Sequence, residues 1–269
     1  MTDIFQKPLT LITSTLDRFF RLPWMQQLQR KHPKLVQFLH NRLGLQNFLG
    51  LPLTLLLGIS IINYALLSEI AENLVNSPGM KAVDSSVGLF LYRLRTDAMA
   101  QAFYYFTQLG TTWGVAATFI LVAAVLLVKK RWHYLVALLV AVLGTGASVY
   151  FTKLYFHRER PLDIGYYKAS SFSFPSGHSA EALALFGIIA VFILLERDHI
   201  RFARFWATLC VVYTVLIGFS RLYLGVHFVS DVAGGYLLGS LWLILAVCVL
   251  EYLLLHYKQN SGIKKLRPL

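Results

Sequence analysis

Three short polar segments, 153–161, 175–178 and 220–231, carry side chains that a plain apolar helical protein does not need. Their candidate chemical residues are two histidines, one aspartate and three strong cations, namely His178, His227, Asp231, Lys153, Arg160 and Arg221. A neutral histidine can act as a nucleophile or a proton carrier near pH 7, and lysine and arginine bind anionic oxygens. These residue types favour covalent or acid–base chemistry on an anionic group such as a phosphate.

The first segment, KLYFHRERP, places Lys153 seven residues before Arg160. Seven residues make about two helical turns, so the two cations share one helical face if the helix continues that far. Pro161 then ends the helix, because proline lacks an amide hydrogen and clashes with the preceding turn. Taken alone, such a lysine is more typical of an interfacial anchor.

The second segment, PSGH, begins a long apolar run, and a proline followed by a serine there is typical of a helix N-terminus. The free amides and positive dipole of that terminus suit a phosphate. The residues at that terminus are Ser176 and Gly177. Gly177 also lets the backbone approach a ligand closely.

The third segment places His227 four residues before Asp231, so the two can lie on one helical face. A carboxylate on one ring nitrogen fixes the histidine tautomer and makes the other nitrogen more basic, as a nucleophile requires. Asp231 also stands at a helix start, where an aspartate commonly acts as a cap or dipole partner. Both roles stay open for Asp231.

The sequence shows no set of metal ligands. The outer acidic residues are scattered and more typical of helix caps or ion pairs: Glu72, Asp84, Asp97 and Asp163. The two cysteines, Cys210 and Cys248, lie in apolar runs and are typical of small buried hydrophobes. We therefore predict a site with no metal and no other cofactor.

The composition indicates a membrane protein. Of 269 residues, 57% are apolar and 14% are charged, with a formal net charge of +12. Soluble domains average about 45–50% apolar and about 25% charged residues, so an ordinary soluble or disordered protein is excluded. A nucleic-acid-binding protein carries its charge on a polar soluble body, so no nucleic-acid partner is expected.

Six segments approach the roughly 20 apolar residues that a bilayer-spanning helix needs. The predicted spans are 48–67, 105–128, 132–152, 179–195, 202–219 and 232–250. The predicted fold class is therefore all-α, a polytopic bundle of six transmembrane helices. Its expected parts are a basic N-terminal segment at 1–47, one membrane domain at 48–255 and a basic tail at 256–269.

Two stretches outside the spans have helical character. Residues 28–43 mix apolar and basic side chains and are either an amphipathic helix on the membrane surface or a solvated tail. Residues 83–94 have apolar side chains at near-helical spacing, which predicts a helix lying near the membrane surface.

The positive charges predict the orientation. With the N-terminus inside, 17 of the 25 lysines and arginines fall in cytoplasmic segments and 8 fall outside. This asymmetry places both termini in the cytoplasm and the three polar segments on the periplasmic or extracellular side. Four outer cations cluster at those segments, namely Lys153, Arg158, Arg160 and Arg221. An anionic substrate is the expected reason for such a cluster.

The three segments resemble the type 2 phosphatidic acid phosphatase family, the membrane relatives of the vanadium haloperoxidases. The family pattern is Lys-x6-Arg-Pro, then Pro-Ser-Gly-His, then Ser-Arg-x5-His-x3-Asp, and this chain has all three without a substitution. The motifs run from 153 to 231, and the six-span layout extends the resemblance over roughly 48–255.

The resemblance implies a metal-independent phosphohydrolase of the bacterial inner (cytoplasmic) membrane that works through a phosphohistidine. His227 is then the nucleophile, Asp231 orients it, and His178 is the general acid and base. The implied phosphate-binding residues are Lys153, Arg160, Ser176, Gly177 and Arg221.

The implied substrate is a lipid phosphate or diphosphate in the bilayer. Undecaprenyl diphosphate is the first expectation, and phosphatidylglycerol phosphate and phosphatidic acid are the alternatives. Phosphoryl transfer to another lipid, such as lipid A, stays open because the sequence does not distinguish water from an alcohol as acceptor. A transporter is the alternative outside enzymes, and it requires ionisable residues at mid-membrane depth. Glu181 lies within a span, but it stands only one turn after His178.

Overall fold

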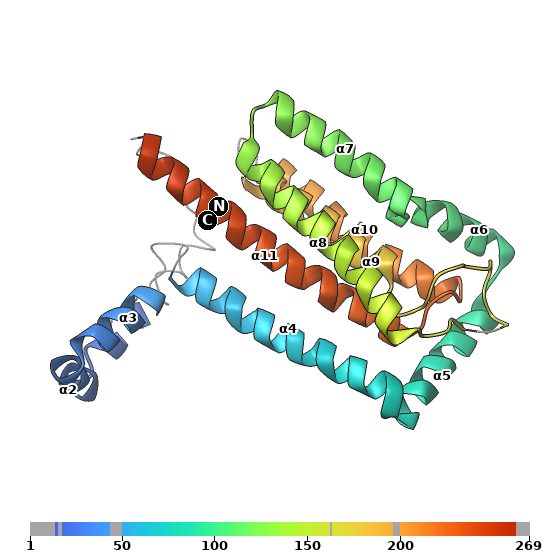
Figure 1. Cartoon of the computed structure of the whole chain (residues 1–269), viewed down its shortest axis with the longest axis horizontal. Helices are drawn as coiled ribbons and strands as arrows, with labels where there is room; N and C mark the ends of the chain where they lie inside the picture. The colour runs from blue at the N-terminus through green and yellow to red at the C-terminus, as the bar shows by residue number, and fades with distance from the viewer. Residues whose placement is uncertain (1–13, 16–17, 44–49, 162, 196–199, 262–269) are drawn as a thin grey trace. The chain divides into compact units, whose positions relative to one another are not determined.

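The computed structural model describes residues 14–15, 18–43, 50–161, 163–195 and 200–261. Every regular element in these ranges is a helix and none is a strand, which confirms the predicted all-α class (Figure 1). The helices, with η1 a short 3₁₀ turn, are α2 (Pro23–Lys31), α3 (Pro33–Leu43), α4 (Leu51–Asn76), α5 (Pro78–Leu94), α6 (Asp97–Phe106), η1 (Thr107–Gly110), α7 (Thr112–Val128), α8 (Trp132–Phe156), α9 (Gly177–Leu195), α10 (Ile200–Tyr223) and α11 (Val229–Ser261).

The chain forms two compact units, one of residues 1–61 with 261–269 and one of residues 62–260. In the first unit α2 and α3 pack against each other. Met25 and Val36 are buried, and the rings of Phe19 and Trp24 meet edge to face at 5.4 Å between centroids. The described part of the stretch 28–43 is therefore helical apart from the break at 32, while its contact with a membrane stays a prediction.

In the part of the chain that the structure describes, five helices are long and apolar enough to cross a membrane. Their spanning parts are Pro52–Asn73, Trp132–Phe156, Gly177–Leu195, Arg201–Tyr223 and Val229–Tyr257. The bent pair Asp97–Gly110 and Thr112–Val128 makes a sixth if it is counted as one span. Trp113, Val128 and Tyr155 are each more than four-fifths exposed, as is typical of side chains that face lipid. The chain is a multi-span membrane protein.

The second span differs from its predicted form. A single helix was expected over 105–128, but the helix breaks at Gly110 and resumes in α7 after a bend of 47°. The hydroxyl of Thr111 accepts a hydrogen bond from the amide of Gly114 at 3.2 Å and donates one to the carbonyl of Gln108 at 2.6 Å. Thr111 is thus an N-cap inside an apolar run, and its local hydrogen bonds start a new helix there.

Helices α7, α8, α9 and α11 share one apolar core, in which Leu138, Leu185 and Leu250 are completely buried. On the other side α9 packs against α10. A Cβ added to Gly239 of α11 would lie 2.4 Å from the carbonyl oxygen of Ala180 in α9, so only glycine permits this approach. The two helix starts, and the polar motifs that they carry, are thereby held together.

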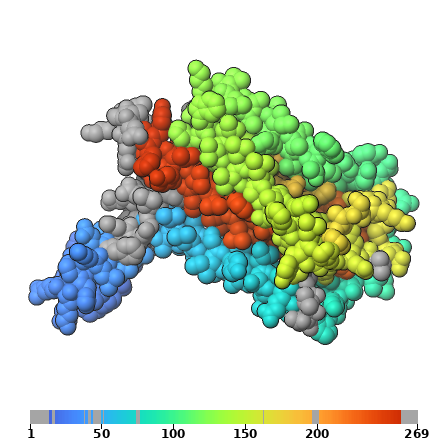
Figure 2. Space-filling model, viewed as in Figure 1, coloured from blue at the N-terminus to red at the C-terminus, as the bar shows by residue number. Residues whose placement is uncertain are grey.

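The segments between α8 and α9 and between α10 and α11 lie at the same end of the second unit as α5 and α6 (Figure 1). In the space-filling view the end of α8 and the yellow segment after it cover this end (Figure 2). The helix expected over 83–94 is present as the longer α5. Its apolar residues Val83 and Phe90 are exposed, whereas Asp84 and Leu91 are buried.

Candidate active site

A pocket with a volume of about 690 Å³ lies at this end of the second unit. Six of the eight site residues predicted from sequence line it: Lys153, Arg160, Gly177, His178, Arg221 and His227. The other two, Ser176 and Asp231, are completely buried. Residues distributed over 153–231 therefore form one site.

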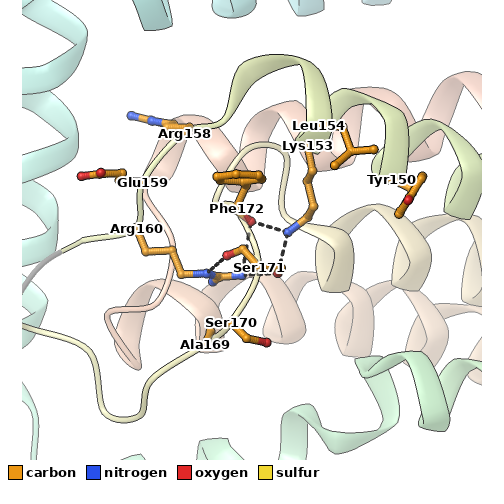
Figure 3. Close-up of a pocket in the computed structure, with 10 residues that line it drawn as sticks. All are labelled: Tyr150, Lys153, Leu154, Arg158, Glu159, Arg160, Ala169, Ser170, Ser171 and Phe172. Atoms are coloured by element: carbon orange, nitrogen blue, oxygen red, sulfur yellow. Dashed lines mark hydrogen bonds between the residues drawn. The ribbon is translucent and has the colours of Figure 1, made fainter.

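Lys153 and Arg160 reach the pocket by a route that the sequence did not predict. They were expected on one face of a continuing helix, but α8 ends at Phe156, and His157 adopts a left-handed backbone with φ 46°. Both cations instead turn toward the segment 171–172, as Figure 3 shows. The Lys153 amine donates to the carbonyl of Phe172 at 2.5 Å, and Arg160 Nε donates to the carbonyl of Ser171 at 2.7 Å. A neighbouring pocket of about 520 Å³ shares both side chains.

His227 is held by Asp231. Its Nδ1 lies 3.3 Å from Asp231 Oδ2, and because a carboxylate only accepts hydrogen bonds, Nδ1 carries the proton. The same oxygen accepts from the amide of Phe228 at 2.8 Å and from the hydroxyl of Ser173. Asp231 therefore caps the start of α11 and fixes the histidine tautomer, with Nε2 unprotonated.

The environment keeps His227 neutral. Burial of the ring lowers the pKa of His227 from its ordinary 6.5 to about 3, although Asp231 opposes the shift. Arg160 Nη1 lies 3.1 Å from His227 Nε2 and donates to the carbonyl of Val226 at 2.6 Å. Desolvation and the nearby Arg221 lower the pKa of Arg160 itself, but an arginine stays protonated in proteins. A neutral ring, whose Nε2 lone pair faces Arg160 Nη1, thus stands beside a fixed cation.

Arg221 and His178 offer unpaired polar atoms at the pocket. Arg221 is 2% exposed, and its Nη2 donates to the hydroxyl of Tyr167 at 2.6 Å. Among the described residues, no partner hydrogen-bonds to Arg221 Nε or to His178 Nε2, although both atoms are buried. Buried polar groups are nearly always satisfied, so these atoms fit the oxygens of a bound phosphate.

Ser176 has a different environment from the predicted one. Its amide donates to the backbone carbonyl of Asp231 at 2.9 Å, and its hydroxyl accepts from Ser179 at 3.0 Å. The amide is therefore occupied by the start of α11 and is not offered to a ligand. Gly177, the first residue of α9, does line the pocket beside His178.

Three residues that contact the site are not among the eight predicted site residues. Ser173 and Arg158 bond the carboxylate of Asp231, and Tyr167 bonds Arg221. Arg158 was visible only as one of the clustered outer cations, and Ser173 gave no signal. In the described ranges no three His, Cys, Asp or Glu side chains gather as a metal site would require. The predicted lack of a metal stays a prediction.

Comparisons with known proteins identify the family of the chain. Residues 132–254 match the model of the PAP2 superfamily. Phosphatidylglycerophosphatase B of Bacillus subtilis (strain 168) is 31% identical over 170 residues, which cover 62% of this chain and 83% of that protein. The chain belongs to the PAP2 superfamily.

Two solved structures share the fold. The crystal structure of the first transmembrane PAP2 type phosphatidylglycerolphosphate phosphatase from Bacillus subtilis superposes with a TM-score of 0.66 at 26% identity, covering 77% of this chain and 98% of that one. LpxE of Aquifex aeolicus gives a TM-score of 0.50 at 25% identity, covering 61% and 94%. The chain is a membrane lipid phosphatase of the PAP2 superfamily, whose phosphatases hydrolyse phosphate esters.

Proposed function

We propose that this protein removes a phosphate from a membrane lipid through a phosphohistidine on His227, without a metal. The observation that carries the proposal is the pocket, in which the three predicted cations Lys153, Arg160 and Arg221 meet two histidines, and one histidine is fixed by a buried carboxylate. Positioning and charge stabilisation supply most of the catalysis in phosphoryl transfer, and this arrangement provides both.

In the first step the lone pair of His227 Nε2 attacks phosphorus, and the bond from phosphorus to the lipid oxygen breaks. His178 gives its proton to that oxygen, so the lipid leaves as a neutral alcohol. The ring of His227 becomes positively charged, and Asp231 stabilises it through Nδ1. Arg160 exchanges its contact with Nε2 for a phosphate oxygen.

In the second step His178 takes a proton from water, and the hydroxide attacks phosphorus. The phosphorus–nitrogen bond breaks, its electron pair returns to Nε2, and inorganic phosphate leaves. Lys153, Arg160 and Arg221 hold the three equatorial oxygens through both steps. Gly177 contributes its backbone amide, whereas Ser176 holds the starts of α9 and α11 together.

For the substrate we propose a lipid phosphate in the outer leaflet of the cytoplasmic membrane. The B. subtilis relative named as a phosphatidylglycerophosphatase supports phosphatidylglycerol phosphate. Undecaprenyl diphosphate stays a prediction, supported by the outward orientation that the basic residues indicate. The catalytic residues all belong to the proposed membrane domain at 48–255, with both termini in the cytoplasm.

The test is phosphate release by the purified protein in detergent with EDTA present, from a matched panel. The panel holds phosphatidylglycerol phosphate, undecaprenyl diphosphate, phosphatidic acid and a soluble sugar phosphate. Release from at least one lipid and none from the sugar phosphate supports the proposal. Failure on every lipid, in a protein that retains its fold, contradicts it.

Transfer to a lipid alcohol is distinguished by its product. The same reactions run with and without lipid A as acceptor show whether phosphate appears free or on the acceptor. Free phosphate in both reactions supports hydrolysis, and a phosphorylated acceptor supports phosphotransfer.

A further inference from the structure

A buried carboxylate of α5 lies behind the active site, on the far side of Arg158 from the catalytic aspartate. Asp84 is 2% exposed although it belongs to a helix whose other face carries exposed apolar residues. Its Oδ1 accepts from the amide of Ser230 at 3.0 Å, and its Oδ2 accepts from the Ser230 hydroxyl at 2.5 Å. Asp84 thus binds the residue that immediately precedes Asp231, from 146 positions away in sequence.

Arg158 joins the two carboxylates. Its Nη2 donates to Asp84 Oδ2 at 2.8 Å, and its Nη1 donates to Asp231 Oδ1 at 2.5 Å. Nη1 also donates to the Ser230 hydroxyl at 2.8 Å, and the guanidinium stacks 4.4 Å from the centre of the Phe228 ring. Arg158 lines the pocket of about 520 Å³ together with Lys153 and Arg160, but its side chain points away from theirs in the close-up (Figure 3).

The two oxygens of the Asp231 carboxylate contact different side chains. Oδ1 is fixed by Arg158, and Oδ2 faces the ring of His227. Fixing Oδ1 sets the rotation of the carboxylate, because the guanidinium is planar and its donors have fixed directions. The orientation of Nδ1, and therefore of Nε2 toward the pocket, follows from that rotation.

The charges give Asp84 a second effect. An arginine facing Asp231 alone would neutralise the carboxylate that must stabilise the positive ring of the phosphohistidine. Because Arg158 also pairs with Asp84, the three side chains of Asp84, Arg158 and Asp231 together carry one net negative charge. Asp231 therefore keeps its ability to stabilise that ring. In a low-dielectric site this difference is large, since charge interactions there are weakly screened.

We propose that Asp84 and Arg158 are positioning residues, which act on the reaction only through Asp231 and His227. The proposal rests on the proposed catalytic roles of Asp231 and His227. It assigns a function to α5, a helix outside the residues 132–254 that match the family model. The alternative is that the pair only anchors α5 to the bundle.

The test compares Asp84→Asn, Arg158→Gln and Arg158→Lys with Asp97→Asn. Asp97 is an exposed aspartate at the start of α6. The variant Asp97→Asn therefore removes the same charge without changing Asp84, Arg158 or Asp231. For Asp84→Asn and Arg158→Gln we expect kcat to fall about tenfold, the size of coupling common between contacting residues. KM changes less than about twofold, because the phosphate-binding cations are untouched. Arg158→Lys keeps the charge and retains an intermediate rate, and Asp97→Asn matches the wild type.

A double-mutant cycle separates positioning from anchoring. In an Asp231→Asn background the effect of Asp84→Asn on kcat should disappear, because the residue through which it acts is already disabled. A tenfold loss that persists in that background, or a rise in KM equal to the fall in kcat, contradicts the proposal. Thermal unfolding of each variant identifies any that fail to fold. If Asp84→Asn or Arg158→Gln fails to fold, the kcat of Arg158→Lys is compared with that of the wild type instead.

The cycle reads total phosphate release and does not depend on which histidine is phosphorylated. A failure of the phosphohistidine proposal would appear as the absence of a labelled His227 in the wild type. A failure of the present proposal would appear as additive losses in the cycle. The two results are therefore distinguishable.

Discussion

Removal of the His178 ring should affect substrates according to their leaving groups. His178 Nε2 lines the pocket with no described hydrogen-bond partner, so its expected role is to exchange protons with the substrate and with water. General acid catalysis contributes about 10²–10⁴-fold, and an alkyl lipid oxygen needs all of this help. His178→Ala should therefore lower kcat/KM for a lipid phosphate by about 10²–10⁴-fold. An aryl phosphate, whose phenol leaves without a proton, should lose much less in the first step.

The assay follows phenol release from an aryl phosphate by stopped flow. Because water activation in the second step also needs His178, the variant should release one equivalent of phenol per enzyme in a burst and then turn over slowly. His133→Ala is the control. This half-buried histidine lies at the start of α8, at the opposite end of that helix from Lys153, and packs against the ring of Tyr257. Equal losses for alkyl and aryl substrates without a burst would refute the assignment and indicate a packing defect.

Four further predictions concern the site and the orientation. Hydrolysis should persist in excess EDTA, because cationic side chains hold the phosphate in the proposed mechanism. Complete loss that only a divalent metal restores would contradict that mechanism. A cysteine at Ser170, which is exposed beside the pocket, should react with an impermeant thiol reagent in intact cells, while one at Asp198, outside the described residues, should not; the reverse pattern would overturn the topology. Burial lowers the pKa of His227 to about 3, so its nucleophilic form persists well below pH 6.5 and kcat/KM should show no acid limb from this residue between pH 7 and 5. The measurement is repeated with substrates whose phosphate groups have different pKa values. An acid limb of kcat/KM that stays near pH 6.5 for all of them would contradict the lowered pKa of His227. Because the unfolded state binds the extra proton between pH 6.5 and 3, the same shift should also make the folded state less stable as pH falls through that range.

Local sequence information predicted the spans, apart from the break in the second, and most of the residues that meet in the pocket. Apolar runs locate helices by their length, and PSGH contains its own helix start, so α9 begins at Gly177 as expected. The i, i+4 spacing correctly predicted that Asp231 lies against His227, although His227 precedes the first residue of α11. The contact forms because Asp231 Oδ2 accepts from the Phe228 amide at the start of α11 and also faces His227 Nδ1. These features depend on neighbours within a few residues, which is why the sequence carries them.

Other features depend on distant partners and were not predictable. The break at Gly110 and Thr111 lies inside an apolar run, where composition indicated one helix. The left-handed His157 ends α8 without a glycine or asparagine to mark the place. The Ser176 amide was expected to be free, but a carbonyl of another helix occupies it. Asp84 appeared as one of several scattered acids, and only the folded structure places it against Arg158.

The central claim is a covalent phosphate on His227, and trapping that intermediate tests it most directly. The purified protein is mixed with ³²P-labelled lipid phosphate, quenched in alkali within milliseconds, digested and mapped by mass spectrometry. We predict a base-stable, acid-labile phosphate on the peptide that contains His227, absent from a folded His227→Ala variant. Label on His178 in that variant would show that the two histidine roles are reversed. Full turnover with no labelled histidine at any quench time would contradict the mechanism.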